Sequence, residues 1–243
     1  MNAAEARARL AALRLRPEHV DVLVAHFEDA DRRGKRGHGL LRIEWIESQP
    51  IDPDANPVLL ESSEGFAHWD GNDALGYLVL DEIVRSLVAN PPERARVVVA
   101  SRCFPSGVLG YWARRLAEAG LVAAVTATSP RRLAHPEGGP PLTGTNPLAI
   151  AVPSSDGPPV VSDVSMGAVT HGDVLAGRAE ASELVPFGGG HSHKAFALAV
   201  GVELLVGALA GPEPGVVLVV ARPEHDPVPG LRELAGARRL PGD

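Results

Sequence analysis

Residues 142–166 read LTGTNPLAIAVPSSDGPPVVSDVSM, and this stretch decides the fold of the chain. Its two short apolar runs, 148–152 and 160–161, each follow turn-forming residues, as β-strands do. Small polar residues precede the first run and Asp163 follows the second, at positions typical of a sheet rim, where ligands usually bind. Turn chemistry alone also explains the glycine, asparagine and proline before the first run, so a plain β-hairpin remains an alternative.

A strand–helix–strand unit precedes this stretch. Residues 96–100 and 121–126 have the composition of buried strands, and 107–119 have helical spacing, which together favour an α/β protein. A Rossmann dinucleotide site requires Gly-x-Gly-x-x-Gly in the first turn and an acid after the second strand. Here the turn has only Gly107 and Gly110, and no acid ends the second strand. We therefore exclude the usual Rossmann site.

Two regions are expected along the chain. Residues 1–50 are predicted to form an N-terminal helical region and 51–243 an α/β nucleotide- and substrate-binding domain; one continuous domain is the alternative. Segments 167–185 and 222–243 are polar or rich in Pro and Gly, and no element is assigned to them. The other predicted elements are helices at 3–15, from Pro17 to Gly34, after Gly39, at 73–89 and at 195–210, a hairpin at 58–69, and a strand at 216–221.

Composition limits the class of protein. A net charge of −7 argues against a nucleic-acid partner, which requires a basic face. The single cysteine, Cys103, suits a reducing cytoplasm, and the N-terminus lacks an apolar signal segment. The longest apolar run, 195–210, is shorter than a comfortable membrane span and contains Glu203. A cytoplasmic protein without a membrane partner is predicted.

The segment around His38 contains residue types that are typical of an active site. Gly37 and Gly39 flank this histidine, which allows close approach to a ligand, and Arg42 follows four residues later, on the same face if one helix contains both. Arginine binds a carboxylate in bidentate fashion and histidine transfers protons, a combination suited to an α-keto or α-imino acid. The alternative is a capping histidine beside a surface arginine.

A second candidate is the glycine-rich loop 186–194. Its glycines, the helix that follows and Lys194 can together bind an anion, although a flexible loop with a solvated lysine explains the same residues. His191 and His193 lie two residues apart without a nearby acid or cysteine, so no metal site is predicted.

Taken together, five segments resemble the type-2 malate/L-lactate dehydrogenase family. That family has, in order, Ser-His-Gly-x-x-Arg, Gly-Thr-Asn-Pro, Asp-x-Ala/Ser, a glycine loop ending in His-Lys-Gly, and Pro-Gly-Glu. The corresponding segments of this chain are 37–42 (GHGLLR), 144–147 (GTNP), 163–165 (DVS), 188–195 (GGGHSHKA) and 241–243 (PGD).

The resemblance implies a non-Rossmann NADPH- or NADH-binding fold around a mostly antiparallel or mixed sheet, usually as a homodimer. His38 is then the acid/base and Arg42 the ligand of a small carboxylate substrate. The expected activity is reduction of a small cyclic α-imino acid or α-keto acid. The residues that the resemblance assigns to the cofactor and the pocket are Ser129, Thr145, Asp163, Val164, Ser165, Lys194, Pro241, Gly242 and Asp243.

The chain also departs from the family pattern. Pro105 stands where the family has a second histidine, 167–185 is shorter, Ala195 replaces a glycine, and the sequence ends at Pro-Gly-Asp where relatives continue. These departures suggest a shortened member. With His38 as the only nearby histidine, imines are expected to react better than ketones. The alternative is a redox-silent descendant that binds a metabolite or catalyses a non-redox proton transfer.

Overall fold

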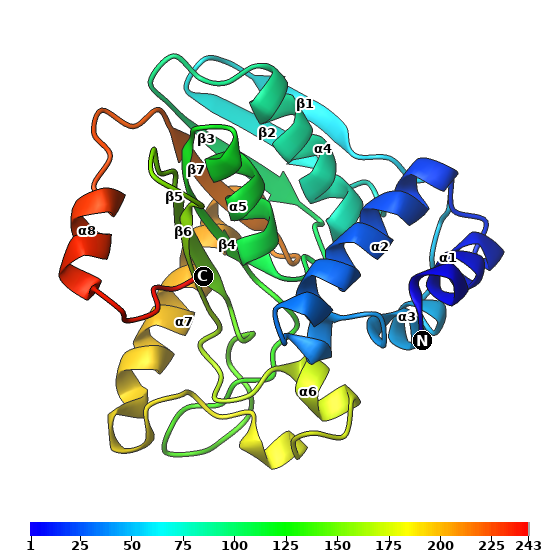
Figure 1. The fold of residues 1–243 in the computed structure, drawn as a ribbon. Helices are drawn as coiled ribbons and strands as arrows, with labels where there is room; N and C mark the ends of the chain where they lie inside the picture. Colours follow the sequence, from blue (N-terminus) through cyan, green and yellow to red (C-terminus); the bar gives the residue numbers. More distant parts are fainter. Residues whose placement is uncertain (243) are drawn as a thin grey trace.

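A seven-stranded sheet lies at the centre of the computed structural model, which describes residues 1–242 (Figure 1). The strand order is β1-β2-β3-β7-β4-β5-β6. The β2–β3 pair is parallel, and the other neighbouring pairs are antiparallel, as predicted for a mixed, mostly antiparallel sheet. The strands are Val58–Ser62 (β1), Phe66–Asp70 (β2), Ala95–Ser101 (β3), Val122–Ala127 (β4), Leu148–Val152 (β5), Val160–Val164 (β6) and Val216–Ala221 (β7).

Helices cover the two faces of this sheet unequally. Helices α4 and α5 pack on one face, next to the N-terminal helices, whereas α7 packs on the other. The α-helices are Ala3–Ala12 (α1), Pro17–Arg32 (α2), Arg42–Glu47 (α3), Gly76–Ala89 (α4), Leu109–Glu118 (α5), His171–Leu175 (α6), Ser192–Ala210 (α7) and Val228–Ala235 (α8). The 3₁₀ turns are Arg36–His38 (η1), Ala181–Glu183 (η2) and Gly189–His191 (η3).

Side chains of β3 alternate between the two faces, as the two-residue period of a strand requires. Val98 and Ala100 belong to the larger core beneath α4 and α5. Val97 and Val99 pack on the opposite side, where Val206 of α7 meets the sheet. The valines of β3 therefore pack on both faces of the sheet. This explains why the strand does not alternate between apolar and polar residues, as a half-exposed strand would.

Two of the predicted strand pairs form, whereas the two strands of the strand–helix–strand unit are not neighbours in the sheet. β5 and β6 form the hairpin expected from residues 142–166, and β1 pairs with β2 as expected for 58–69. The strand–helix–strand unit also forms as β3, α5 and β4, but β7 lies between its two strands. This insertion brings the most C-terminal strand into the middle of the sheet.

Helices α6 and α8 lie in the two segments to which the sequence assigned no element. In α6, the Thr170 side chain accepts a hydrogen bond from the Asp173 N–H, and the Asp173 side chain accepts one from the Thr170 N–H. This capping box satisfies two donors of a helix only five residues long. α8 begins after Pro227 and has Pro at its first turn, where the missing N–H costs nothing.

The N-terminal helices share their buried residues with the sheet. Leu10 of α1, Phe27 of α2 and Ile43 of α3 belong to the same hydrophobic core as Leu80 of α4 and Leu218 of β7. We propose on this basis that residues 1–50 and 51–243 are one continuous domain rather than two.

Asn146 joins the loop before β5 to α7. It is fully buried with φ of 34°, a left-handed conformation that asparagine tolerates. Its Nδ2 donates to the carbonyl of Ala199 at 2.9 Å and to Oε2 of Glu203 at 2.7 Å, and the Gly144 N–H donates to the same Glu203 oxygen at 3.3 Å. Glu203, the one acid in this apolar helix, is thereby explained as a structural partner of the loop.

Replacing Asn146 with Ala should lower the free energy of unfolding by about 2–3 kcal/mol. The variant leaves the Glu203 carboxylate without its closest donor and places alanine at a positive φ. Urea denaturation measures the change. Asn90→Ala is the matched control, because Asn90 is exposed and its loss should change the free energy by less than about 0.5 kcal/mol. Equal effects of the two variants would contradict the structural role of Asn146.

Helix α7 is longer than the apolar run 195–210 suggested. The stretch Gly189–Ala210 is long and apolar enough to cross a membrane by length and composition, and 22% of its most apolar window is buried within the protein. Ala199 and Val206 face inward and pack on neighbouring elements. The outward side exposes four leucines, Leu198, Leu204, Leu205 and Leu209.

We expect a homodimer or a larger homo-oligomer that covers these leucines, since exposed apolar patches of this kind usually bind a partner. Light scattering at micromolar concentration should give at least twice the mass of one chain. Leu204→Asp should shift the mass toward that of a monomer. A wild-type monomer would refute the expectation.

Candidate active site

A cavity of about 340 Å³ lies where the N-terminal helical region meets the ends of β5 and β6. Its walls come from the turn η1, the segment 104–109 before and at the start of α5, the loops that flank β5 and β6, and α6. Helices early in the chain and loops more than one hundred residues later thus contribute to one site. A cavity of this size is within the usual range for a small ligand.

His38 and Arg42 both line this cavity, but they do not share one helix. His38 ends η1, whereas α3 begins only at Arg42. The expectation of a common helical face is therefore wrong, and the turn between the two residues directs both side chains to the cavity.

The glycine before His38 is required by a close backbone contact. A Cβ on Gly37 would lie 2.9 Å from the carbonyl carbon of Gly172 in α6, and a Cβ on Gly172 would lie 2.2 Å from the carbonyl oxygen of Gly37. Both distances are too short for any side chain. The contact therefore fixes α6 against the turn that contains His38.

His38 is neutral near pH 7. Burial lowers its pKa to about 4, and the charge of Arg42 acts in the same direction. Nearby Asp163 opposes the shift without overcoming it. An unprotonated imidazole can accept one hydrogen bond and donate another, but it is not a strong acid.

Arg42 is the buried cation of the cavity. It is 9% exposed, and its Nε and Nη1 atoms lack a hydrogen-bond partner. Its guanidinium carbon lies 3.9 Å from the centre of the Trp45 ring, which supports one face of the group. The phenol of Tyr77 lies alongside, and burial raises the pKa of Tyr77. A buried guanidinium with free donors is suited to binding an anion.

Four of the residues assigned by resemblance line the same cavity. Ser129, Thr145, Asp163 and Ser165 bring three hydroxyls and a carboxylate to it from three separate segments. Val164 does not line the cavity, because neighbouring residues of a strand point to opposite faces, and its side chain is exposed.

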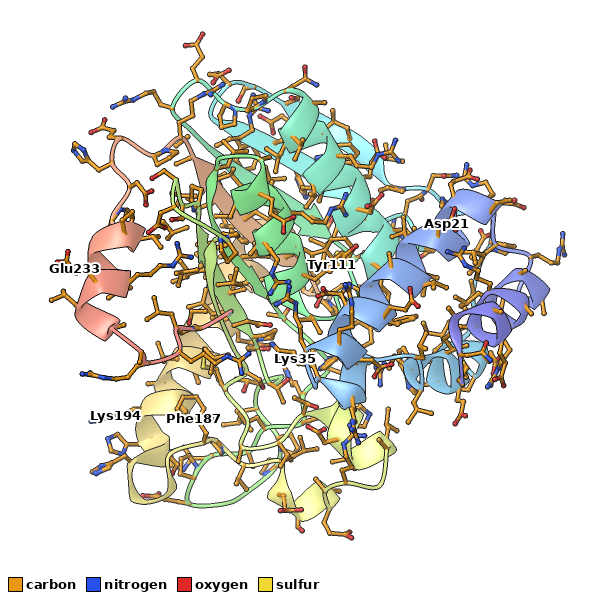
Figure 2. The ribbon with its side chains drawn as sticks, viewed as in Figure 1. Asp21, Lys35, Tyr111, Phe187, Lys194 and Glu233 are labelled. Atoms are coloured by element: carbon orange, nitrogen blue, oxygen red, sulfur yellow. The ribbon has the colours of Figure 1, made fainter. Side chains whose placement is uncertain are left out.

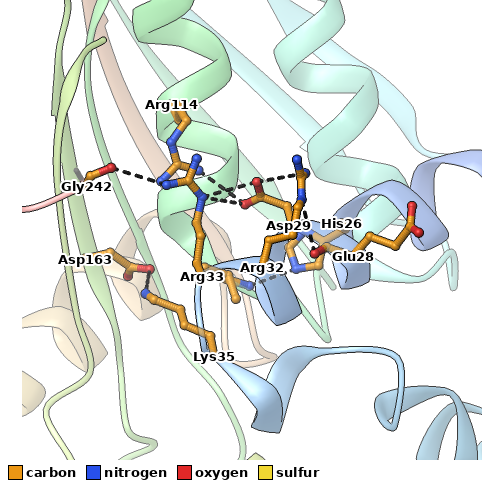
Figure 3. A network of polar contacts seen from close by, with 10 residues as sticks. His26, Glu28, Asp29, Arg32, Arg33, Lys35, Arg114, Asp163 and Gly242 are labelled. Atoms are coloured by element: carbon orange, nitrogen blue, oxygen red, sulfur yellow. Dashed lines mark hydrogen bonds and ion pairs between the residues drawn. The ribbon is translucent and has the colours of Figure 1, made fainter. Parts of the chain in front are cut away.

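Lys35 was not anticipated as a site residue, yet its ammonium group forms an ion pair with Asp163 (Figure 3). Both residues line the cavity. Beside this pair, Asp29 of α2 accepts hydrogen bonds from Arg33 at 3.0 Å and from Arg114 of α5 at 3.3 Å. These contacts hold the end of α2, and with it η1, against α5 and β6.

The remaining assigned residues lie outside the cavity lining. Lys194 is exposed at the start of α7, well away from Lys35 in Figure 2. Pro241 accepts a hydrogen bond from the Val161 N–H at 3.1 Å, and the Gly242 carbonyl accepts one from Arg33 at 3.2 Å. Asp243 lies outside the described residues. The cofactor roles of these residues stay predictions.

Two further residues of the cavity are not among those that the resemblance assigns to the site. Arg132 follows β4 and His171 begins α6, and both line the cavity. His38 is therefore not the only histidine nearby, which corrects the expectation drawn from Pro105, itself a lining residue. Burial lowers the pKa of His171 to about 4, with further contributions from Arg132 and Arg42. The Thr170–Asp173 capping pattern was the sequence signal for α6.

A family model described as malate/L-lactate dehydrogenase matches residues 3–183. The chain belongs to the malate/L-lactate dehydrogenase family. Among solved structures, it resembles the Δ1-piperideine-2-carboxylate reductase of Pseudomonas syringae pv. tomato with a TM-score of 0.84 and 25% identity, over 99% of this chain and 89% of that one. It also resembles malate dehydrogenase of Pyrococcus horikoshii OT3, with a TM-score of 0.81 and 22% identity, over 99% of this chain and 82% of that one.

Curated relatives match over a shorter span. The Δ1-pyrroline-2-carboxylate/Δ1-piperideine-2-carboxylate reductase of P. syringae pv. tomato is 30% identical over 80% of this chain. The (2R)-3-sulfolactate dehydrogenase (NADP(+)) of Chromohalobacter salexigens is 31% identical over 69% of this chain. The match spans 65% of the length of the first relative and 51% of the second.

Stability should fall as the pH decreases from 6.5 toward 4. The pKa values of His38 and His171 are about 4 in the folded chain, below the model-peptide value of 6.5, so the unfolded chain takes up protons first. Urea denaturation at several pH values tests this. The double variant His38→Gln/His171→Gln should show a smaller fall. His225→Gln, at an exposed position, should leave the fall unchanged.

Buried His26 has its pKa lowered as well, so part of the fall should persist in the double variant. A double variant with the full wild-type fall would contradict the assignment to His38 and His171.

Proposed function

We propose that this protein is a nicotinamide-dependent reductase of a small cyclic α-imino acid. The observation that carries the proposal is the placement of neutral His38 and of Arg42, buried with unpartnered nitrogens, in one cavity. A small α-keto acid is the second candidate substrate class. The sulfolactate dehydrogenase among the relatives favours it, because such enzymes act on the 2-hydroxy acid and 2-oxo acid pair.

In this proposal Arg42 binds the substrate carboxylate. Its Nε and Nη1 are donors without a partner that an anion can satisfy, and Trp45 keeps the guanidinium plane in place. His38 then contacts the imine nitrogen, which is bonded to the carbon that bears the carboxylate. As a neutral imidazole, it accepts a hydrogen bond from an iminium N–H and so orients the C=N bond for reduction.

A nicotinamide cofactor, NADPH or NADH, supplies the hydride when it is bound. The donor set of the cavity fits such a group. The hydroxyls of Ser129, Thr145 and Ser165 and the carboxylate of Asp163 suit ribose hydroxyls and a carboxamide. Lys35 neutralises Asp163, which lowers the electrostatic cost of bringing a phosphorylated ligand near it.

The state of His38 favours imines over ketones. Reduction of a ketone builds negative charge on oxygen, which requires an acid or a strong donor in the transition state. A protonated imine brings its own positive charge and leaves no alkoxide. Pro105 offers no side-chain donor to the cavity, and His38 is held unprotonated. The named activity of the Pseudomonas relatives, reduction of Δ1-pyrroline- and Δ1-piperideine-2-carboxylate, supports this substrate class.

Variants of His38 and Arg42 should have different kinetic effects. His38→Ala should lower kcat by roughly 10²-fold, because it removes the group that orients the C=N bond for reduction. Arg42→Ala should mainly raise KM for the substrate, because it removes the carboxylate ligand. His225→Ala is the matched control at an exposed histidine. Unchanged kinetics in both site variants would exclude this cavity as the active site.

Substrate choice tests the function itself. Oxidation of NADPH and NADH, followed by absorbance, should be faster with Δ1-piperideine-2-carboxylate or Δ1-pyrroline-2-carboxylate than with pyruvate or oxaloacetate, compared as kcat/KM. Pro105→His should raise the ketone rate more than the imine rate. A wild-type preference for 2-oxo acids would move the proposal to the second substrate class. Consumption of neither cofactor with any of these acids would favour the redox-silent alternative.

We also propose that the protein acts as a homodimer in the cytoplasm. The exposed leucines of α7 support a partner surface. Cys103, the single cysteine, is fully buried, and burial raises the pKa of its thiol, so it is neither a nucleophile nor half of a disulfide within the chain.

A further inference from the structure

Three arginines line the cavity, of which Arg36 is exposed, and the two that are buried or half-buried, Arg42 and Arg132, are paired with no carboxylate there. The two acids of the cavity are already paired, Asp163 with Lys35, and Asp173 with Arg178 at 2.9 Å. Among residues 1–242, Arg42 and Arg132 form no ion pair with an acid within 4 Å. Two cations confined without counter-charge repel each other, and an anion bound between them removes that cost.

Arg132 is held at the cavity by its backbone. The N–H groups of Arg132 and Leu133 donate to the Thr143 carbonyl at 2.8 and 2.9 Å, and Leu133 is fully buried. The Arg132 side chain is half-buried and donates to the Pro130 carbonyl at 3.3 Å. Its neighbour Arg131 is exposed. One of two adjacent arginines is therefore directed inward by a fixed loop, while the other faces solvent.

His171 completes the cluster. Its Nδ1 atom is buried and lacks a hydrogen-bond partner. The Gly37–Gly172 contact fixes the residue that follows it, and the capping box fixes the start of α6. All three groups line the same cavity, and the charges of Arg132 and Arg42 add to the effect of burial in lowering the pKa of this imidazole.

One carboxylate cannot satisfy all three groups. A carboxylate bound at Arg42, next to His38, leaves Arg132 and the buried Nδ1 of His171 unmatched. We infer that Arg132 and His171 form a second anion subsite, which binds the second carboxylate of a cyclic imino diacid. This inference rests on the proposed function for the ring and the first carboxylate.

The cofactor offers other anions, but they fit this place less well. In a nicotinamide dinucleotide the phosphates are separated from the nicotinamide ring by at least a ribose. The reacting ring must lie within about 3–3.5 Å of the substrate carbon that takes the hydride. Arg132 and His171 line the same cavity as His38 and Arg42. The second anion is therefore assigned to the substrate.

Planar, unreactive analogues test the subsite without turnover. Pyridine-2,6-dicarboxylate and pyridine-2-carboxylate differ only by the second carboxylate, and Trp45 beneath Arg42 reports their binding by fluorescence, with calorimetry as confirmation. The wild-type protein should bind the dicarboxylate at least tenfold more tightly. Arg132→Gln and His171→Asn should each reduce that ratio toward one, and Arg132→Lys should keep part of it. Arg131→Gln is the matched control and should leave the ratio unchanged.

Three results would overturn the subsite. The first is equal affinity of the wild-type protein for both analogues. The second is an equal loss of affinity for both analogues in Arg132→Gln, with the ratio preserved. The third is weaker NADPH binding in Arg132→Gln with an unchanged analogue ratio, which would assign the anion to a cofactor phosphate. Circular dichroism melting of each variant confirms folding.

The outcome is separable from that of the proposed function. Reduction of Δ1-piperideine-2-carboxylate without any preference for the dicarboxylate analogue would uphold the reductase and reject the subsite. Preference for the dicarboxylate analogue, lost in Arg132→Gln, without oxidation of NADPH or NADH would uphold the subsite and reject the reductase.

Discussion

The position of β7 is the constraint on which the rest of the structure depends. This strand is the last of the sheet in sequence, yet it pairs with β3 on one side and with β4 on the other. It joins a half formed by β1, β2 and β3 to a half formed by β4, β5 and β6. His38 and Arg42 belong to the N-terminal helical region, whereas Thr145, Asp163 and His171 belong to the loop before β5, to β6 and to α6. The cavity between them exists only when this non-local pairing has formed, a step that carries a high loop-closure entropy.

Local patterns predicted most elements of the fold. Valine-rich runs, alternating strands and proline or glycine boundaries identified β1 to β7 and the longer helices, because these signals act over a few residues. The place of β7 between β3 and β4 could not be predicted in this way, because no local feature distinguishes a neighbouring strand from an inserted one. Helices α6 and α8 were missed because each is short and depends on capping or on a proline start more than on apolar spacing.

The site was predictable where motif and geometry coincide. His38 and Arg42 stand close in sequence, and the glycine before His38 is required by its backbone contact with Gly172. Ser129, Thr145, Asp163 and Ser165 required the order of motifs along the chain, since only the folded sheet brings them together. No sequence motif surrounds Lys35, Arg132 or His171. Their role depends on which charged and polar groups they lie beside in the folded chain, and this is not visible in the sequence. Lys194 shows the opposite case, a persuasive local motif whose side chain faces solvent in this chain.

The contact between Gly37 and Gly172 has a consequence for how this site can change over evolutionary time. A tight packing contact between unlike residues can drift, because a larger side chain on one side is compensated by a smaller one on the other. Here both partners are already the smallest residue, and the atoms that meet are backbone atoms. A larger residue at either position therefore cannot be compensated by a smaller one at the other. The distance between η1 and α6 cannot change by substitution at this contact, and new substrate preferences must arise from the side chains that surround it.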